Sequence, residues 1–193
     1  MYFKSILSFL LIFILKFNST FAFTQDISLT ILVRSSLDME YVLAKSICKL
    51  LDRELRRSHN FGGSNTLECN IRFDDSIDEI ITKIEQNQFQ YAVIKSDDLL
   101  DRPSNLAIRS VLHFPADKNY VFISNQNVDP EIIKQINYGI LRHLLEFQHL
   151  HSQFKNFTED SLIVKQEIPM HMGTLRFSDE WSIKKNNGFI EVE

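Results

Sequence analysis

Apolar residues recur along the chain in two periods, and the change from one period to the other predicts an α/β fold. Three short runs rich in β-branched and aliphatic residues predict strands at 27–33, 67–73 and 89–94. Between them, apolar positions at helical spacing predict one helix beginning near Asp38 and a second beginning near Ser76. The order strand, helix, strand, helix, strand predicts a mostly parallel sheet flanked by helices, with right-handed crossovers.

The pattern changes after the third predicted strand. The predicted segments are a helical turn at 96–100, strands at 106–113 and 120–124, and a long amphipathic helix from Asp129-Pro130 to Phe147. A short helix capped by Thr158 and a loop at 169–177 follow, and the loop leads into a last turn or short helix. Proline in the first helical position suits the start of the long helix. Because the chain has no internal repeat and no low-complexity linker, we expect a single domain whose C-terminal helices pack on the sheet.

Residues 1–22 have the pattern of a secretory signal peptide. Lys4 precedes an apolar run at 6–15, and small residues lead to a candidate cleavage position after Ala22. The apolar run is about half of the ~20 residues that span a bilayer, which favours a cleaved signal over the alternative, a permanent anchor. We therefore expect a single exported domain at 23–193.

Charge and motifs narrow the chemistry of this domain. The formal net charge of the chain is −4, and the predicted signal peptide carries lysines but no acids. An acidic exported domain argues against nucleic acid as a partner. No Gly-x-Ser-x-Gly elbow accompanies the serines, so we expect no enzyme activity.

The histidines also argue against a metal site. His149 and His151 lie two positions apart and would point away from each other on a helix, and His143 lies about two turns from His151. The fourth candidate, His171, lies far along the chain. We therefore expect neither a metal nor another cofactor.

The chain has two cysteines, one in the first predicted helix and one in the second predicted strand. Neighbouring elements could bring Cys48 and Cys69 within the ~4.4–6.8 Å between Cα atoms that a disulfide requires. An exported protein favours a disulfide, and the alternative is a pair of buried free thiols.

Ligands of open parallel sheets bind outside the carboxyl ends of the strands. In this chain that rule selects Ser35-Ser36, Asp74-Asp75-Ser76 and Ser96-Asp97. Each segment precedes a helix start, where free N–H groups favour an anion. The alternative is that Asp38, Ser76 and Ser96 are only N-caps, and the aspartates would repel an anion.

These residues also resemble a known family, the TAXI-type solute receptors of TRAP transporters. Residues 27–124 are similar to the first lobe of those receptors through Ser46-Ile47-Cys48, Cys69 and Lys95-Ser96-Asp97. Three later segments are similar to the closing part of the family: 128–130, 147–151 and 169–177. The resemblance implies a lobe like that of type II periplasmic binding proteins and a periplasmic location. It also implies a small carboxylate or amino acid as ligand and TRAP membrane subunits as partners.

The chain departs from the family in two ways. The first-lobe pattern occupies 23–124 and the closing pattern begins at 128, which leaves no room for a second lobe. The family's glycine-bearing loop after the first strand is replaced by Ser35-Ser36-Leu37-Asp38, and its Gly-Ser pair after the second strand by Asp75-Ser76. The family's ligand positions carried over to this chain are Tyr41, Ser76, Ser96 and Asp97.

A single lobe leaves a ligand exposed, whereas small-molecule sites normally bury ~70–90% of the ligand surface. We therefore expect an exported solute-binding-like domain whose capture of a small carboxylate or amino acid is reduced or lost. The alternative is a periplasmic protein–protein interaction module that uses the surface a second lobe would cover.

Overall fold

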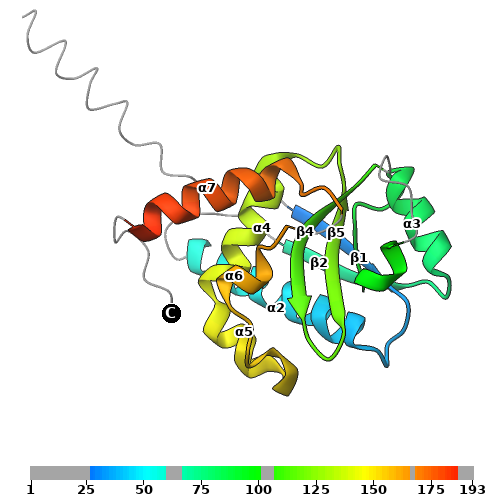
Figure 1. The fold of residues 1–193 in the computed structure, drawn as a ribbon, viewed down its shortest axis with the longest axis horizontal. Helices are drawn as coiled ribbons and strands as arrows, with labels where there is room; N and C mark the ends of the chain where they lie inside the picture. The colour runs from blue at the N-terminus through cyan, green and yellow to red at the C-terminus, as the bar shows by residue number, and fades with distance from the viewer. Residues whose placement is uncertain (1–26, 60–66, 101–106, 166–167, 187–193) are drawn as a thin grey trace, which may run out of the picture.

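A mixed sheet of five strands forms the centre of the computed structural model, which describes residues 27–59, 67–100, 107–165 and 168–186 (Figure 1). The strands are β1 (Ile27–Val33), β2 (Leu67–Phe73), β3 (Tyr91–Lys95), β4 (Ile108–Pro115) and β5 (Asn119–Asn125). Their order across the sheet is β2-β1-β3-β5-β4. The predicted signal peptide, residues 1–22, lies outside the described residues.

The first three strands confirm the predicted parallel arrangement, and the last two do not extend it. β1 pairs in parallel with both β2 and β3. β4 and β5 form an antiparallel hairpin, and β5 also runs antiparallel to β3. A short connection can join antiparallel strands, whereas a parallel pair needs a long crossover, so the short turn after Pro115 forces the hairpin. The fold is α/β, and its sheet is mixed.

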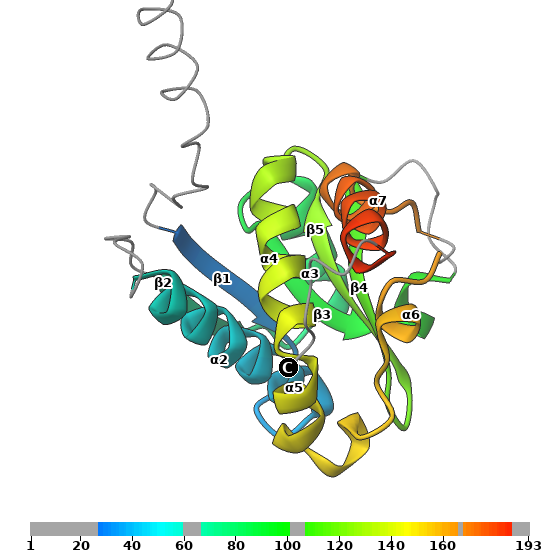
Figure 2. The same ribbon diagram turned by 90° about the vertical axis from the view of Figure 1, so that its left-hand side faces the viewer.

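Helices cover both faces of the sheet (Figures 1 and 2). The described helices are α2 (Met39–His59), α3 (Ile77–Glu85), α4 (Pro130–Arg142), α5 (Leu144–Leu150), α6 (Glu159–Leu162) and α7 (Met172–Asn186), with 3-10 turns η1 (Ser96–Leu99) and η2 (Ser152–Phe154). One face carries α2 and the C-terminal helices, and the other carries α3 and η1. In Figure 2, α2 and α4 lie in front of the sheet and α3 lies behind it.

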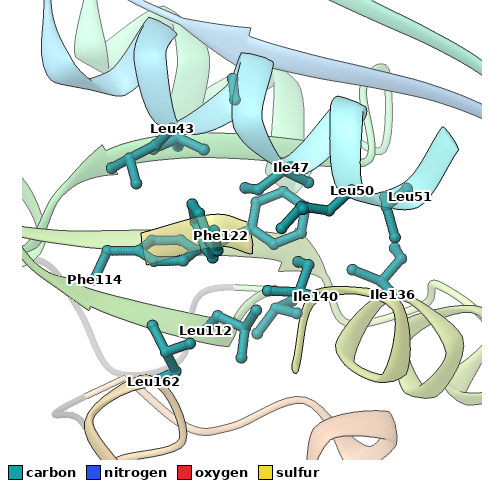
Figure 3. Packing of buried hydrophobic residues seen from close by; sticks show 14 of the residues in the cluster. Leu43, Ile47, Leu50, Leu51, Leu112, Phe114, Phe122, Ile136, Ile140 and Leu162 are labelled. Atoms are coloured by element: carbon teal, nitrogen blue, oxygen red, sulfur yellow. The ribbon is translucent and has the colours of Figure 1, made fainter. Parts of the chain in front are cut away.

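The two faces bury separate apolar clusters, as the alternation along the strands requires. On β1, Leu29, Ile31 and Val33 enter the larger cluster, and Leu32 enters the smaller one with the isoleucines of α3. Figure 3 shows Leu43 and Ile47 of α2 packed above the rings of the β4–β5 hairpin, together with side chains of α4. Each fully buried side chain of this size stabilises the fold by ~1.5–3 kcal/mol.

The predicted long helix from 129 to 147 is wrong in one respect, because it breaks at His143 into α4 and α5. A single carboxylate of α2 holds both residues at the break. Glu54 accepts a hydrogen bond from Arg142 Nη1 at 2.8 Å, and its other oxygen lies 2.9 Å from His143 Nε2. This tertiary anchor overrides the continuous apolar period of the sequence.

The prediction of a loop at 169–177 is also wrong from Met172 onward, where the long helix α7 begins. The N–H of Gly173 donates to Nδ1 of His171 at 3.0 Å, and the N–H of Leu175 donates to the carbonyl of His171 at 3.1 Å. His171 therefore caps the helix, although histidine is not among the residues usually preferred there. A Cβ on Gly173 would lie 2.3 Å from the carbonyl oxygen of Pro130, so glycine permits close packing of α7 on α4.

The cysteine prediction is confirmed. Cys48 of α2 and Cys69 of β2 form a disulfide with their Cα atoms 5.6 Å apart. The bond ties the edge strand to the helix that crosses from β1 to β2. Within the described ranges, no helix is long and apolar enough to span a bilayer.

Candidate functional site

The parallel strands bring the predicted ligand segments to one margin of the sheet. Val33 pairs with Phe73 at the ends of β1 and β2, and the N–H of Asp74 donates to the carbonyl of Val33 at 3.0 Å. Lys95 at the end of β3 pairs with Tyr120, which places the β4–β5 turn at the same margin. We call this margin the carboxyl edge; it comprises residues 34–41, 73–76, 96–98 and 116–118.

The strand order reverses between β1 and β3, because the chain places β2 on one side of β1 and β3 on the other. Such a switch point is where open α/β sheets bind ligands, since the connections diverge there and leave a crevice. The residues that follow β1 and β3 at this point are Arg34 and Ser96 to Asp98. The structure therefore places two of the predicted segments at the expected position.

An ion-pair cluster of the protein's own residues occupies this switch point. Arg34 Nε donates to Glu40 Oε1 at 3.0 Å, and Arg34 Nη2 also contacts Glu40 Oε1. The backbone N–H of Arg34 donates to Glu40 Oε2 at 3.1 Å. From the other side, Asp98 Oδ2 lies 3.1 Å from Arg34 Nη2. We call Arg34, Glu40 and Asp98 the switch-point triad.

Burial makes the triad a strong interaction. The Glu40 side chain is fully buried and the Arg34 side chain mostly so. The side-chain hydrogen bond to Glu40 raises the pKa of Arg34, so the guanidinium stays charged at any physiological pH. Because arginine binds carboxylates in a bidentate fork, Glu40 takes the position that the carboxylate of a ligand would need.

Sequence reasoning missed the triad. A signal was present, since Arg34 directly follows a strand and Glu40 lies in the first turn of the next helix. Acidic residues are common in the first turn of a helix, because they complement its dipole, so Glu40 alone does not indicate a partner. The contribution of Asp98 depends on β3 lying beside β1, which the chain order does not reveal.

Two of the predicted ligand hydroxyls accept hydrogen bonds from nearby backbone N–H groups. Ser35 Oγ accepts from the N–H of Leu37 at 3.1 Å, and Ser76 caps α3 by accepting from the N–H of Glu79 at 3.5 Å. Ser96 differs, because its Oγ is buried and has no hydrogen-bond partner among the described residues. Ser36 and Asp97 are exposed at the same edge.

Tyr41 lies at the carboxyl edge with its ring against Phe73, the two centroids being 5.7 Å apart. Tyr41 is half-buried, whereas 53% of Phe73 is exposed. Leu37, one turn before Tyr41, is 93% exposed. The edge therefore presents apolar side chains to solvent beside the predicted ligand positions.

The electrostatic balance of the edge is acidic. Its carboxylates are Asp38, Glu40, Asp74, Asp75, Asp97, Asp98 and Asp117, and the cations nearby are Arg34, Lys83, Lys95 and Lys118. The ion pair with Lys83 holds the pKa of Asp74 below its usual value. Burial raises the pKa of Tyr120 to about 12, and the charges of Asp117, Glu40 and Asp38 contribute to the shift. An anionic ligand meets repulsion here.

The histidines considered as metal ligands make contacts within the protein. His143 pairs with Glu54, His149 Nδ1 lies 2.6 Å from the carbonyl of Leu145, and His171 caps α7. His151 Nδ1 accepts from the N–H of Gln153 at 3.3 Å. Across the described part of the chain, no three histidines, cysteines or carboxylates are grouped so that they could hold a metal ion.

Comparison with known proteins identifies no relative of this chain. Neither a scan against protein-family models nor a search of the curated proteins gives a match. The resemblance to the TAXI-type receptors therefore stays a prediction from the residues.

Proposed function

We propose that the chain is an exported, receptor-like domain of one lobe, related to the TAXI-type receptors, with reduced or lost capture of a small carboxylate or amino acid. The finer fold proposed is a lobe of the type II periplasmic-binding-protein kind. Three features support the proposal: the parallel β2-β1-β3 unit, the Cys48–Cys69 disulfide, and the packing of α4 and α7 beside the same sheet. The periplasm is the compartment that this proposal implies.

The observation that carries the loss of capture is the bond between Arg34 and Glu40 at the switch point. A ligand carboxylate that took the bidentate position on Nε and Nη2 of Arg34 would have to displace Glu40, which is fully buried and receives three separate donors from Arg34. Leaving a buried carboxylate without its partner costs ~3–5 kcal/mol, which a weakly held small ligand does not recover. Asp75 and Asp97 add repulsion at the same edge.

Titration calorimetry of residues 23–193 with glutamate, glutamine and succinate tests this proposal. We expect no saturable heat with millimolar ligand and no rise in thermal stability. A ligand present at ~100 times its dissociation constant would stabilise the fold by ~2.7 kcal/mol, so thermal unfolding detects binding that calorimetry misses. Micromolar binding of any of the three compounds would contradict the proposal.

A second function, a periplasmic interaction module, is favoured by a different observation. Leu37 and Phe73 are large apolar side chains exposed at the carboxyl edge, the side that a second lobe would cover. Phe73 also stacks on the half-buried Tyr41, and apolar groups gathered on one surface often mark a protein interface. TRAP membrane subunits are the partners that the resemblance suggests. Solute binding without partner binding would favour the first function, and partner binding without solute binding the second.

A further inference from the structure

We propose that the carboxyl edge docks a partner protein through a segment that carries lysine or arginine around an apolar side chain. This inference rests on the interaction function proposed above and adds the chemistry of the partner. The contact surface is the apolar patch, defined as Leu37, Tyr41 and Phe73, together with the acidic rim, defined as Asp38, Asp75, Asp97 and Asp117, which are spread along the same carboxyl edge.

The apolar patch is held in place by the fold. Phe73 is the last residue of β2 and pairs with Val33 of β1, and its ring packs against Tyr41 of α2. The N–H of Tyr41 donates to the carbonyl of Asp38 at 3.1 Å, and the N–H of Leu37 donates to Ser35 Oγ, so the turn that carries Leu37 is bonded on both sides. The backbone that carries Leu37 and the ring of Phe73 are therefore preorganised, which lowers the entropy cost of binding.

Access to the patch is open because β2 is an end strand of the sheet. Among the described strands, β2 pairs only with β1, whereas the opposite end strand, β4, is bridged to the segment before α7. Phe73 therefore lies at the corner between the open side of the sheet and the carboxyl edge. On the open side of β2, none of the described strands covers Phe73.

The acidic rim selects the charge of the partner. None of its four aspartates forms an ion pair with another described residue, whereas Asp74 and Asp98 at the same edge are paired with Lys83 and Arg34. Asp38 directly follows Leu37, and Asp75 follows Phe73 by two positions. Asp117 lies in the turn between β4 and β5, at the same end of the sheet as Asp97, because Tyr120 of β5 pairs with Lys95 at the end of β3. A cation beside the apolar contact gains from these charges.

The same charges disfavour other occupants. A second copy of this chain would bring its own acidic rim against this one, and the chain as a whole carries a net charge of −4. Nucleic acid and membranes rich in anionic lipid are repelled for the same reason. The pairing of apolar contact with acidic surroundings instead complements a basic and apolar protein segment, whose association it would steer and accelerate.

Nuclear magnetic resonance titration of residues 23–193 with three synthetic peptides tests the proposal. One peptide combines lysine with leucine, the second glutamate with leucine, and the third lysine with serine. We expect the lysine–leucine peptide to shift the amide signals of 35–41 and 73–76 in a saturable manner. We expect at least about tenfold weaker binding from the other two peptides, equivalent to ~1.4 kcal/mol.

Variants of the protein locate the contact. The double variant Leu37→Ser, Phe73→Ser should lower the affinity for the lysine–leucine peptide by about tenfold. This is the loss expected for two exposed apolar contacts of an interface. The double variant Asp38→Asn, Asp75→Asn should lower the affinity for this peptide by a few fold and make the affinity less dependent on salt. Ile183→Ser is the matched control, because Ile183 lies on α7 and is 60% exposed. Thermal unfolding of each variant verifies that it folds.

Three results would overturn the proposal: shifts that map elsewhere, equal binding of the glutamate–leucine peptide, or no effect of either double variant. These outcomes are independent of solute capture. Micromolar binding of glutamate or succinate contradicts the loss of capture while leaving the peptide result intact. Absence of peptide binding, with no solute binding, contradicts the docking surface alone.

Discussion

Glu40 lies in the first turn of α2 with its carboxylate buried against the Arg34 guanidinium. Its position satisfies two demands at once, because the helix N-terminus favours an acid and the guanidinium requires a partner. Asp98 adds a second carboxylate, so the negative charges of the triad outnumber its one cation. Arg34 is therefore a structural link between β1, α2 and η1.

Replacing Glu40→Gln tests this structural role. The amide keeps one acceptor for Arg34 but loses the charge, and its NH₂ group faces the guanidinium. We expect the free energy of unfolding to fall by about 2 kcal/mol, less than the loss of a fully buried pair because Arg34 keeps Asp98. Urea unfolding followed by circular dichroism measures the change. Asp97→Asn, an exposed neighbour, is the control and should change stability by less than ~0.5 kcal/mol.

His171 predicts how stability depends on pH. Burial lowers its pKa below the ordinary 6.5, with a further contribution from the charge of Arg109. The unfolded chain therefore binds the proton at a higher pH than the folded chain does, and acidification favours unfolding. The contribution of neutral His171 to the free energy of unfolding is complete above pH 6.5. It declines as the pH falls from there through the lower pKa of the folded state. Protonation at Nδ1 also removes the acceptor for the Gly173 N–H.

Thermal unfolding measures this dependence at a series of pH values from about 5 to about 8, which bracket the ordinary pKa of histidine. His171→Asn is the informative variant, since asparagine can still accept from the helix N–H but does not titrate. The difference in stability between the native chain and this variant should shrink or reverse below about pH 6.5. A difference that stays constant across the range would contradict the assignment of the pH dependence to His171.

Strands and most helix starts were predictable from the sequence because their signals are local. β1, β2 and α3 follow directly from the apolar periods and from the capping serine at position 76. The break between α4 and α5 was not predictable, because the cause is a carboxylate of α2 that lies about ninety positions earlier in the chain. The start of α7 was missed because its cap is a buried histidine.

The candidate site shows the same division. The three strand ends that form the carboxyl edge follow from the rule for parallel sheets, and the structure places Ser35, Ser76 and Ser96 along that edge. The switch-point triad could not be predicted, since it joins groups from three segments. Which carboxylate reaches Arg34 depends on side-chain packing within the edge. The sequence therefore indicated which segments share the carboxyl edge, and the structure added the pairing of Arg34 with Glu40 and Asp98.

The sheet as a whole has one half built from crossovers and one half built from a hairpin. The C-terminal helices pack over the face that both halves share, and α4 contacts α2 and α7 together. β2 is the strand with the least support, because it lies at the end of the sheet and pairs only with β1 among the described strands. The disulfide between Cys48 and Cys69 compensates by attaching this strand to α2.

Reduction of the disulfide should therefore lower the stability of the entire fold. The cysteines are 21 positions apart, and closing a loop of that length stabilises by about 3 kcal/mol in the chain-entropy model. We expect a reductant to lower the free energy of unfolding of residues 23–193 by about this amount, which is measured as a lower midpoint in urea. The double variant Cys48→Ala, Cys69→Ala should have the lower midpoint with or without reductant. An unchanged midpoint of the native chain after verified reduction would contradict the role given to this bond, and would mean that pairing with β1 and packing against α2 suffice to hold β2.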